Sequence, residues 1–181
     1  MIFNNKREQS KNMDKDDVLR KLGLGDPNKF EKWKKEALKN YINQTNKRFY
    51  NDNKDCAKFL INLMIGTAED NVYIYSGNLP EYYYGQAFKS TNAKTINILV
   101  DNDTDVNWVN EYKNKNKKIK YTKLKESTNT PNHFFLVDKK SFRYETNKKV
   151  GTAIANFNEE ETVSKGIRLF NKLREESKVS A

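Results

Sequence analysis

The chain has 181 residues, of which 36% are hydrophobic and 12% aromatic, so it can bury the core of one domain. Its formal net charge of +10 favours anionic partners such as nucleic acid, anionic lipid or an acidic protein surface, although a solvated lysine-rich surface explains the same charge. With one cysteine and one histidine, the composition excludes an internal disulfide and a zinc site built from cysteine and histidine.

No stretch approaches the roughly 20 apolar residues of a membrane-spanning helix. Residues 1–17 are polar and charged and contain no apolar run of signal-peptide length. We therefore expect an intracellular protein, either cytoplasmic or packaged in a particle that is made inside a cell.

The start of the chain shows no hydrophobic periodicity. Residues 1–15 are rich in polar residues, and we expect them to be flexible. Residues 16–22 fit a short helix. The pattern then stays helical to residue 68, which predicts a helical extension over residues 16–68 and an α/β domain over residues 69–181.

Two longer helices are expected within this extension. Asp26-Pro27 is an N-cap followed by proline at the first helical position, and apolar residues follow at helical spacing as far as Ile42. The second helix begins near Asn53 or Asp55, and Gly66 is suited to end it. We expect the two helices to form a hairpin that packs on the domain that follows.

Strands and helices alternate after residue 70. Apolar runs predict strands at residues 72–76, 95–100 and 119–124, with helices between them. A hairpin of residues 133–137 and 142–145, a strand at 152–157 and a helix from residue 159 follow. This alternation predicts an α/β fold with a mostly parallel, twisted sheet flanked by helices.

Polar residues lie at the ends of the expected strands, where α/β sheets bind their ligands. We expect three strand ends and one strand–helix turn to form one ligand site from Ser76, Asn78, His133, Arg143, Glu145, Asn156 and Asn158. A structural role for His133 and an ordinary surface ion pair between Arg143 and Glu145 are the alternatives.

His133 lies on an apolar strand that ends at Asp138, and Ala155-Asn156-Phe157 precedes the last helix. Together with the order of elements from residue 71 to residue 176, these residues resemble one half of the phospholipase D superfamily. That family pairs two such halves and carries His-x-Lys-x4-Asp followed by Gly-Ser-x-Asn-Phe. The resemblance implies phosphodiester chemistry, with a nucleophilic histidine, a second histidine from the other half as general acid, and phosphate held by the lysine, serine and asparagine.

The chain departs from this motif. Counted from His133, the lysine position holds Phe135; aligned on Asp138 instead, Pro131 stands at the nucleophile and His133 at the lysine. Ile154 replaces the serine. The chain therefore resembles the catalytically inactive members, which keep the fold as a binding module. An active site would need a homodimer to supply a second histidine.

Lysines are densest near the third predicted strand, at Lys113, Lys115, Lys117, Lys118, Lys120, Lys123 and Lys125. Such a patch can follow a phosphate backbone and gives salt-dependent, sequence-independent binding. The alternative is a solvated edge strand that lysines protect from aggregation.

Two other groups have both a functional and a structural interpretation. Residues 82–84 are three consecutive tyrosines, which can stack on bases or pack a helix face. Asp101, Asp103 and Asp105 lack the glycine and the glutamate of a calcium loop. We therefore expect neither a metal site nor a cofactor.

The favoured hypothesis is a non-enzymatic module that binds a polyanion, either nucleic acid or anionic lipid, or a partner protein. A homodimeric phosphodiesterase or nuclease that uses His133 is the second hypothesis. The third is a structural or regulatory protein of a phage or mobile element, whose positive charge only aids packing with nucleic acid.

Overall fold

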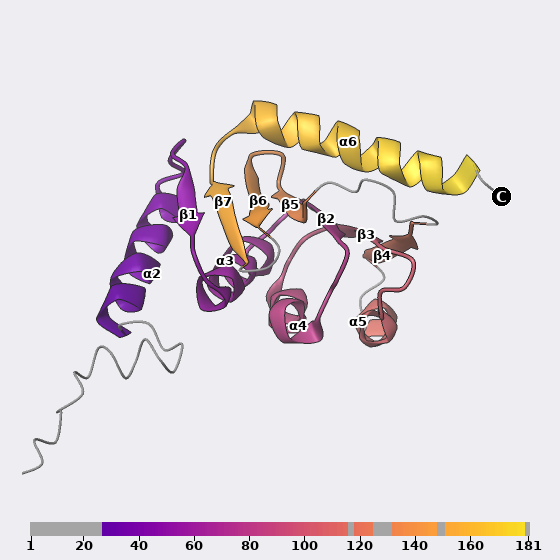
Figure 1. Cartoon of the computed structure of the whole chain (residues 1–181), viewed down its shortest axis with the longest axis horizontal. Coiled ribbons are helices and arrows are strands. Elements are labelled where there is room, and N and C mark those ends of the chain that lie inside the picture. The colour runs from indigo at the N-terminus through magenta and orange to yellow at the C-terminus, as the bar shows by residue number, and fades with distance from the viewer. Residues whose placement is uncertain (1–26, 116–117, 125–131, 148–150, 180–181) are drawn as a thin grey trace, which may run out of the picture.

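The computed structural model describes residues 27–115, 118–124, 132–147 and 151–179 (Figure 1). The elements are α2 (Pro27–Ile42), β1 (Phe49–Asn51), α3 (Lys54–Gly66), β2 (Asn71–Ser76), α4 (Glu81–Ser90), β3 (Thr95–Val100), α5 (Asn107–Lys115), β4 (Ile119–Lys123), β5 (Phe134–Val137), β6 (Ser141–Asn147), β7 (Thr152–Asn156) and α6 (Glu160–Val179). None of the helices in these ranges is long and apolar enough to cross a bilayer.

Seven strands form one sheet in the order β1-β7-β6-β5-β2-β3-β4. Only β2–β3 and β3–β4 pair in parallel, and the other neighbouring strands are antiparallel. The predicted α/β class is confirmed, while the sheet is mixed rather than mostly parallel. The reason is that only three residues separate β5 from β6 and four separate β6 from β7, which are too few for the crossover that parallel neighbours need.

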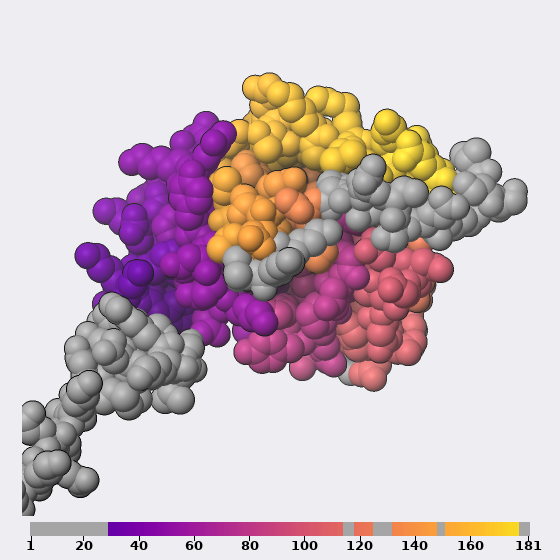
Figure 2. All heavy atoms as spheres, in the orientation of Figure 1, coloured from indigo at the N-terminus to yellow at the C-terminus, as the bar shows by residue number. Residues whose placement is uncertain are grey.

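Helices cover both faces of the sheet. In Figure 1, α3, α4 and α5 lie on one face and α6 crosses the other. Buried side chains such as Ile74 and Ile98 face the first group, and Tyr75 and Leu99 pack with Phe170 of α6. The space-filling view in Figure 2 shows α6 along one side of the molecule, with β6 and β7 between it and α3. The strands β2 and β3 are buried on both faces, and their side chains alternate between two cores.

The region before β2 contains a strand that was not predicted. Both expected helices are present, and the Asn53 side chain caps α3 by accepting a hydrogen bond from the amide of Cys56 at 2.9 Å. Between them, β1 pairs with β7, with Phe49 opposite Ala155. The flexible start and the helix predicted at residues 16–22 lie outside the described residues. The division at residues 68 and 69 stays a prediction, and the β1–β7 pairing joins the two segments.

Asp138 has a structural role at the β5–β6 turn. It and Lys139 adopt left-handed φ angles of 51° and 61°, which suits a tight hairpin. The Asp138 carboxylate accepts backbone hydrogen bonds from Glu69, Asp70 and Asn71 at 3.0, 2.8 and 3.1 Å. It therefore holds the start of β2 against the hairpin, at the sheet edge opposite His133.

We expect Asp138→Ala to lower the free energy of unfolding by about 2–4 kcal/mol, because three amides lose a charged acceptor and alanine disfavours a positive φ. Asp138→Asn keeps an acceptor oxygen and tolerates this φ, so its cost should be only about 1 kcal/mol. Urea unfolding of the two variants measures the difference. An alanine variant as stable as the asparagine variant would contradict this role.

Burial, followed by the nearby Asp52 carboxylate, raises the pKa of the Cys56 thiol to about 11. The unfolded thiol titrates near about 8.5, so it ionises first as the pH rises. We expect the free energy of unfolding to fall between about pH 9 and about pH 11. At about pH 9, iodoacetamide should modify the native protein roughly 100-fold more slowly than the urea-unfolded chain, since only the thiolate reacts. Equal rates would refute the protected thiol.

Candidate functional site

A cleft of about 260 Å3 opens at the sheet edge where β2 and β6 end and β5 begins. Strand register brings these ends together, because Phe134 lies opposite both Tyr75 and Tyr144. The helices α3 and α4 form its other wall. We call this the edge cleft; it is lined by Lys54, Ala57, Ile61, Ser76, Asn78, Pro80, Tyr83, Tyr84, His133, Arg143, Glu145 and Gly151.

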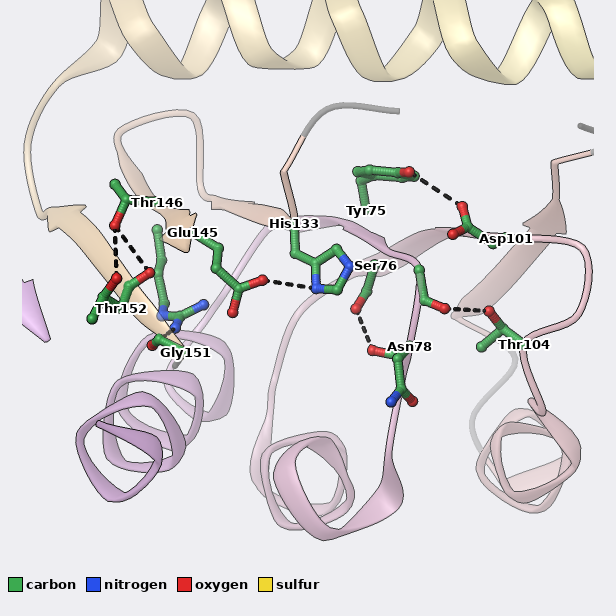
Figure 3. Close-up of polar contacts among 12 residues, drawn as sticks. Tyr75, Ser76, Asn78, Asp101, Thr104, His133, Glu145, Thr146, Gly151 and Thr152 are labelled. Carbon is green, nitrogen blue, oxygen red and sulfur yellow. Dashed lines mark hydrogen bonds and ion pairs between the residues drawn. The ribbon is translucent and has the colours of Figure 1, made fainter. Parts of the chain in front are cut away.

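The His133 imidazole and the Glu145 carboxylate face each other in the edge cleft (Figure 3). Nδ1 of His133 lies 2.9 Å from Oε2 of Glu145, and the two side chains are 20% and 11% exposed. No hydrogen bond of good geometry reaches this buried Oε2 from the described residues. The carboxylate therefore orients the ring.

The other ring nitrogen of His133 faces the loop after β2. A Cβ at Gly77 would collide with the Asp101 carboxylate and come within 3.2 Å of Nε2 of His133. Asp101 in turn accepts a hydrogen bond from the hydroxyl of Tyr75 at 3.2 Å. Glycine is therefore the residue that lets this loop pass so close to the imidazole.

Arg143 is a buried cation beneath the cleft. It is 4% exposed, and burial lowers its pKa, an effect that the neighbouring Tyr84 and Glu145 oppose. Nε donates to Oδ1 of Asn51 at 3.0 Å and Nη2 donates to the carbonyl of Gly151 at 3.3 Å. Arg143 thus links β6 to β1 and to the residue before β7. The alternative prediction of a surface ion pair between Arg143 and Glu145 is wrong, because both residues are buried.

Hydroxyl and amide groups complete the cleft. The buried Ser76 hydroxyl donates to the carbonyl of Asn78, whose side chain is exposed at the rim. Burial raises the pKa values of Tyr83 and Tyr84, so both phenols remain hydrogen-bond donors at neutral pH.

The structure does not bring Asn156 and Asn158 to this cleft. Asn156 lies opposite Phe142, at the far end of β6 from Glu145, because β7 runs antiparallel to β6. Its amide donates to Asn46 and Glu159, and its oxygen accepts from the amide of Asn158. The predicted convergence is therefore wrong for these two residues, which organise the start of α6.

The lysine patch lies at the outer strand of the sheet. Lys118, Lys120 and Lys123 are exposed on or beside β4, and Lys113 of α5 lies 5.5 Å from the ring centroid of Tyr121. Lys117 and Lys125 lie outside the described residues, and so does the side chain of Lys115. The strand order places β2 and β3 between this patch and His133.

Seven of the twelve residues that line the cleft are missing from the site predicted by the sequence, among them Lys54, Tyr83 and Gly151. Lys54 begins α3 and lies far from His133 in the chain. The sequence indicates only packing or base stacking for Tyr83, and no sequence pattern marks Gly151 as part of a site. Among the described residues, no three His, Cys, Asp or Glu side chains gather as a metal site.

No protein-family model and no curated protein matches the chain. Among solved structures, TrmBL2, an archaeal chromatin protein whose structure shows a novel mode of DNA binding, matches with a TM-score of 0.55 and 13% identity over 88% of this chain. The match covers 64% of TrmBL2, so this chain spans less than two thirds of that protein.

Two further structures are similar. NucT from Helicobacter pylori matches with a TM-score of 0.51 and 15% identity, over 72% of this chain and 96% of NucT. Nuc from Salmonella typhimurium, a member of the phospholipase D family, has a TM-score of 0.49 and 14% identity over 72% of this chain and 96% of Nuc. Such identities show the fold alone. This chain shares an α/β fold with TrmBL2 and NucT, with a mixed, open sheet flanked by helices.

Proposed function

We propose that this chain is a non-enzymatic, phospholipase D-like module that binds nucleic acid at the edge cleft. The observation that carries the proposal is the set of groups in the cleft. Cationic and hydrogen-bond-donating side chains surround His133, but Phe135, where the motif has lysine, is 1% exposed and packs in the core. The cleft can therefore bind an anion without the cation that phosphodiester cleavage needs beside the imidazole.

A nucleotide fits both kinds of group in the cleft. Its phosphate oxygens can accept hydrogen bonds from Lys54, which is exposed at the rim. Its base carries N–H groups, which can donate to the Glu145 carboxylate in the lining of the cleft. A lipid phosphate offers acceptors but no base, so nucleic acid matches more of the cleft.

Charge and fold support the same class of ligand. The chain carries a net charge of +10, and exposed Lys120 and Lys123 lie on β4. TrmBL2, which shares this fold, is a DNA-binding chromatin protein. Nucleic acid is therefore the first polyanion to test.

We expect fluorescence anisotropy to show DNA binding that weakens steeply with salt, with a logarithmic slope of about −0.7 per phosphate neutralised on a single strand. Lys54→Ala should weaken binding and reduce the magnitude of this slope by about 0.7, because one phosphate contact is lost.

Lys172→Ala is the matched control, since Lys172 is an exposed lysine on α6, across the sheet from α3. It should leave both the affinity and the slope unchanged. Binding that is insensitive to salt, or equal effects of the two variants, would count against the edge cleft.

The His133–Glu145 pair favours a second candidate, a phosphodiesterase. An imidazole with a carboxylate at Nδ1 is oriented as a nucleophile or general base requires. The chain has one histidine, so a two-histidine mechanism would need two copies of the chain with their clefts facing each other.

We expect no turnover of bis-p-nitrophenyl phosphate or of single-stranded DNA by the wild type, with or without divalent cations, since Phe135 stands where the motif has lysine. Product release can be followed by absorbance and by gel electrophoresis. His133→Ala is the control: turnover that this variant abolishes would replace the binding proposal by the enzymatic one.

A further inference from the structure

Helices α3 and α4 carry basic and aromatic side chains beside the edge cleft. We call this group the α3–α4 rim; it consists of Lys54 and Lys58 on α3 and Tyr82 and Tyr83 on α4. Lys54 and Tyr83 also line the cleft, so the rim is continuous with it. Tyr82 is 65% exposed, more than any other aromatic residue that the structure describes.

Two contacts hold the exposed Tyr82 ring in place. Nζ of Lys58 lies 3.5 Å from the ring centroid, over one face, and the Tyr83 ring lies 5.2 Å away at an interplanar angle of 80°. With the ammonium over one face and a T-shaped contact to Tyr83, Tyr82 still leaves 65% of its surface exposed. The ring is therefore a positioned flat surface, and little side-chain entropy would be lost when a ligand stacks on it.

A purely structural role explains this placement less well. An exposed cation–π contact contributes only about 0.5–1 kcal/mol, and a tyrosine that only packed would turn its ring toward the core, as Tyr84 does at 7% exposure. Aromatic rings flanked by cations are the usual binding surface for unpaired bases, because every base has a flat face and every linkage a phosphate.

We propose that Tyr82 stacks on a base of single-stranded nucleic acid, with Lys54 and Lys58 at the adjoining phosphates. The inference rests on the proposed function and adds the form of the ligand. In a duplex the base faces are covered by their neighbours, so the ring can reach them only in a single strand. The rim thus selects single strands over duplexes.

Three labelled probes of equal length test this inference by anisotropy: a single strand of mixed sequence, the same strand in a duplex, and an abasic strand. The single strand should bind most tightly. Tyr82→Ala should weaken that binding roughly tenfold and leave abasic binding unchanged, because an abasic strand has no base to stack.

Two variants separate stacking from other effects. Tyr82→Phe keeps the ring and should retain wild-type affinity. Tyr50→Ala removes a similarly exposed tyrosine, 61% exposed on β1, and should have no effect. Circular dichroism checks that each variant is folded.

The outcomes distinguish the two proposals. Equal binding of the mixed-sequence and abasic strands, unaffected by Tyr82→Ala, would overturn the stacking role and leave nucleic-acid binding standing. Tighter binding of the duplex than of the single strand would also overturn the stacking role and leave nucleic-acid binding standing. No binding of any probe at low salt would overturn the proposed function, and the stacking role with it.

Discussion

The antiparallel pairing of β5 with β2 is the constraint on which the edge cleft depends. Its register sets Phe134 opposite Tyr75, so His133, just before β5, lies next to the end of β2. The hairpin then returns along β6, and the amide of Glu145 donates to the carbonyl of His133 at 2.8 Å. Because side chains alternate along a strand, a slip of one residue would turn the carboxylate of Glu145 to the face that α6 covers.

The chemistry of the cleft follows from which of its groups already have partners. Arg143 donates hydrogen bonds to the Asn51 side chain and to the Gly151 carbonyl, so it joins strands while it adds positive charge beneath the cleft. The Glu145 carboxylate lies against the His133 imidazole, with Oε2 2.9 Å from Nδ1. A cleft that offers both donors and acceptors differs from a cluster of cations around one phosphate, and it matches the mixed polarity of a nucleotide.

Most helices and strands could be predicted because their signals are local. Apolar alternation predicted β2 and β3, and Asn53 with Gly66 marked the two ends of α3. The strand β1 was missed, since its three residues are too few to show a period. The direction of β7 could not be read from the sequence either, because it depends on pairing with β6 on one side and β1 on the other.

Local sequence patterns were enough to predict the α/β class and the polar strand ends, including His133, Glu145 and Ser76. Which of these ends meet became clear from the pairing of the strands. The tertiary structure excluded Asn156, which the antiparallel course of β7 carries to the opposite edge, and it added Lys54 from the start of α3. The physical reason is that hydrophobic period and capping act over a few residues, whereas a site joins strand ends whose direction is set by hydrogen bonds between segments far apart in the chain.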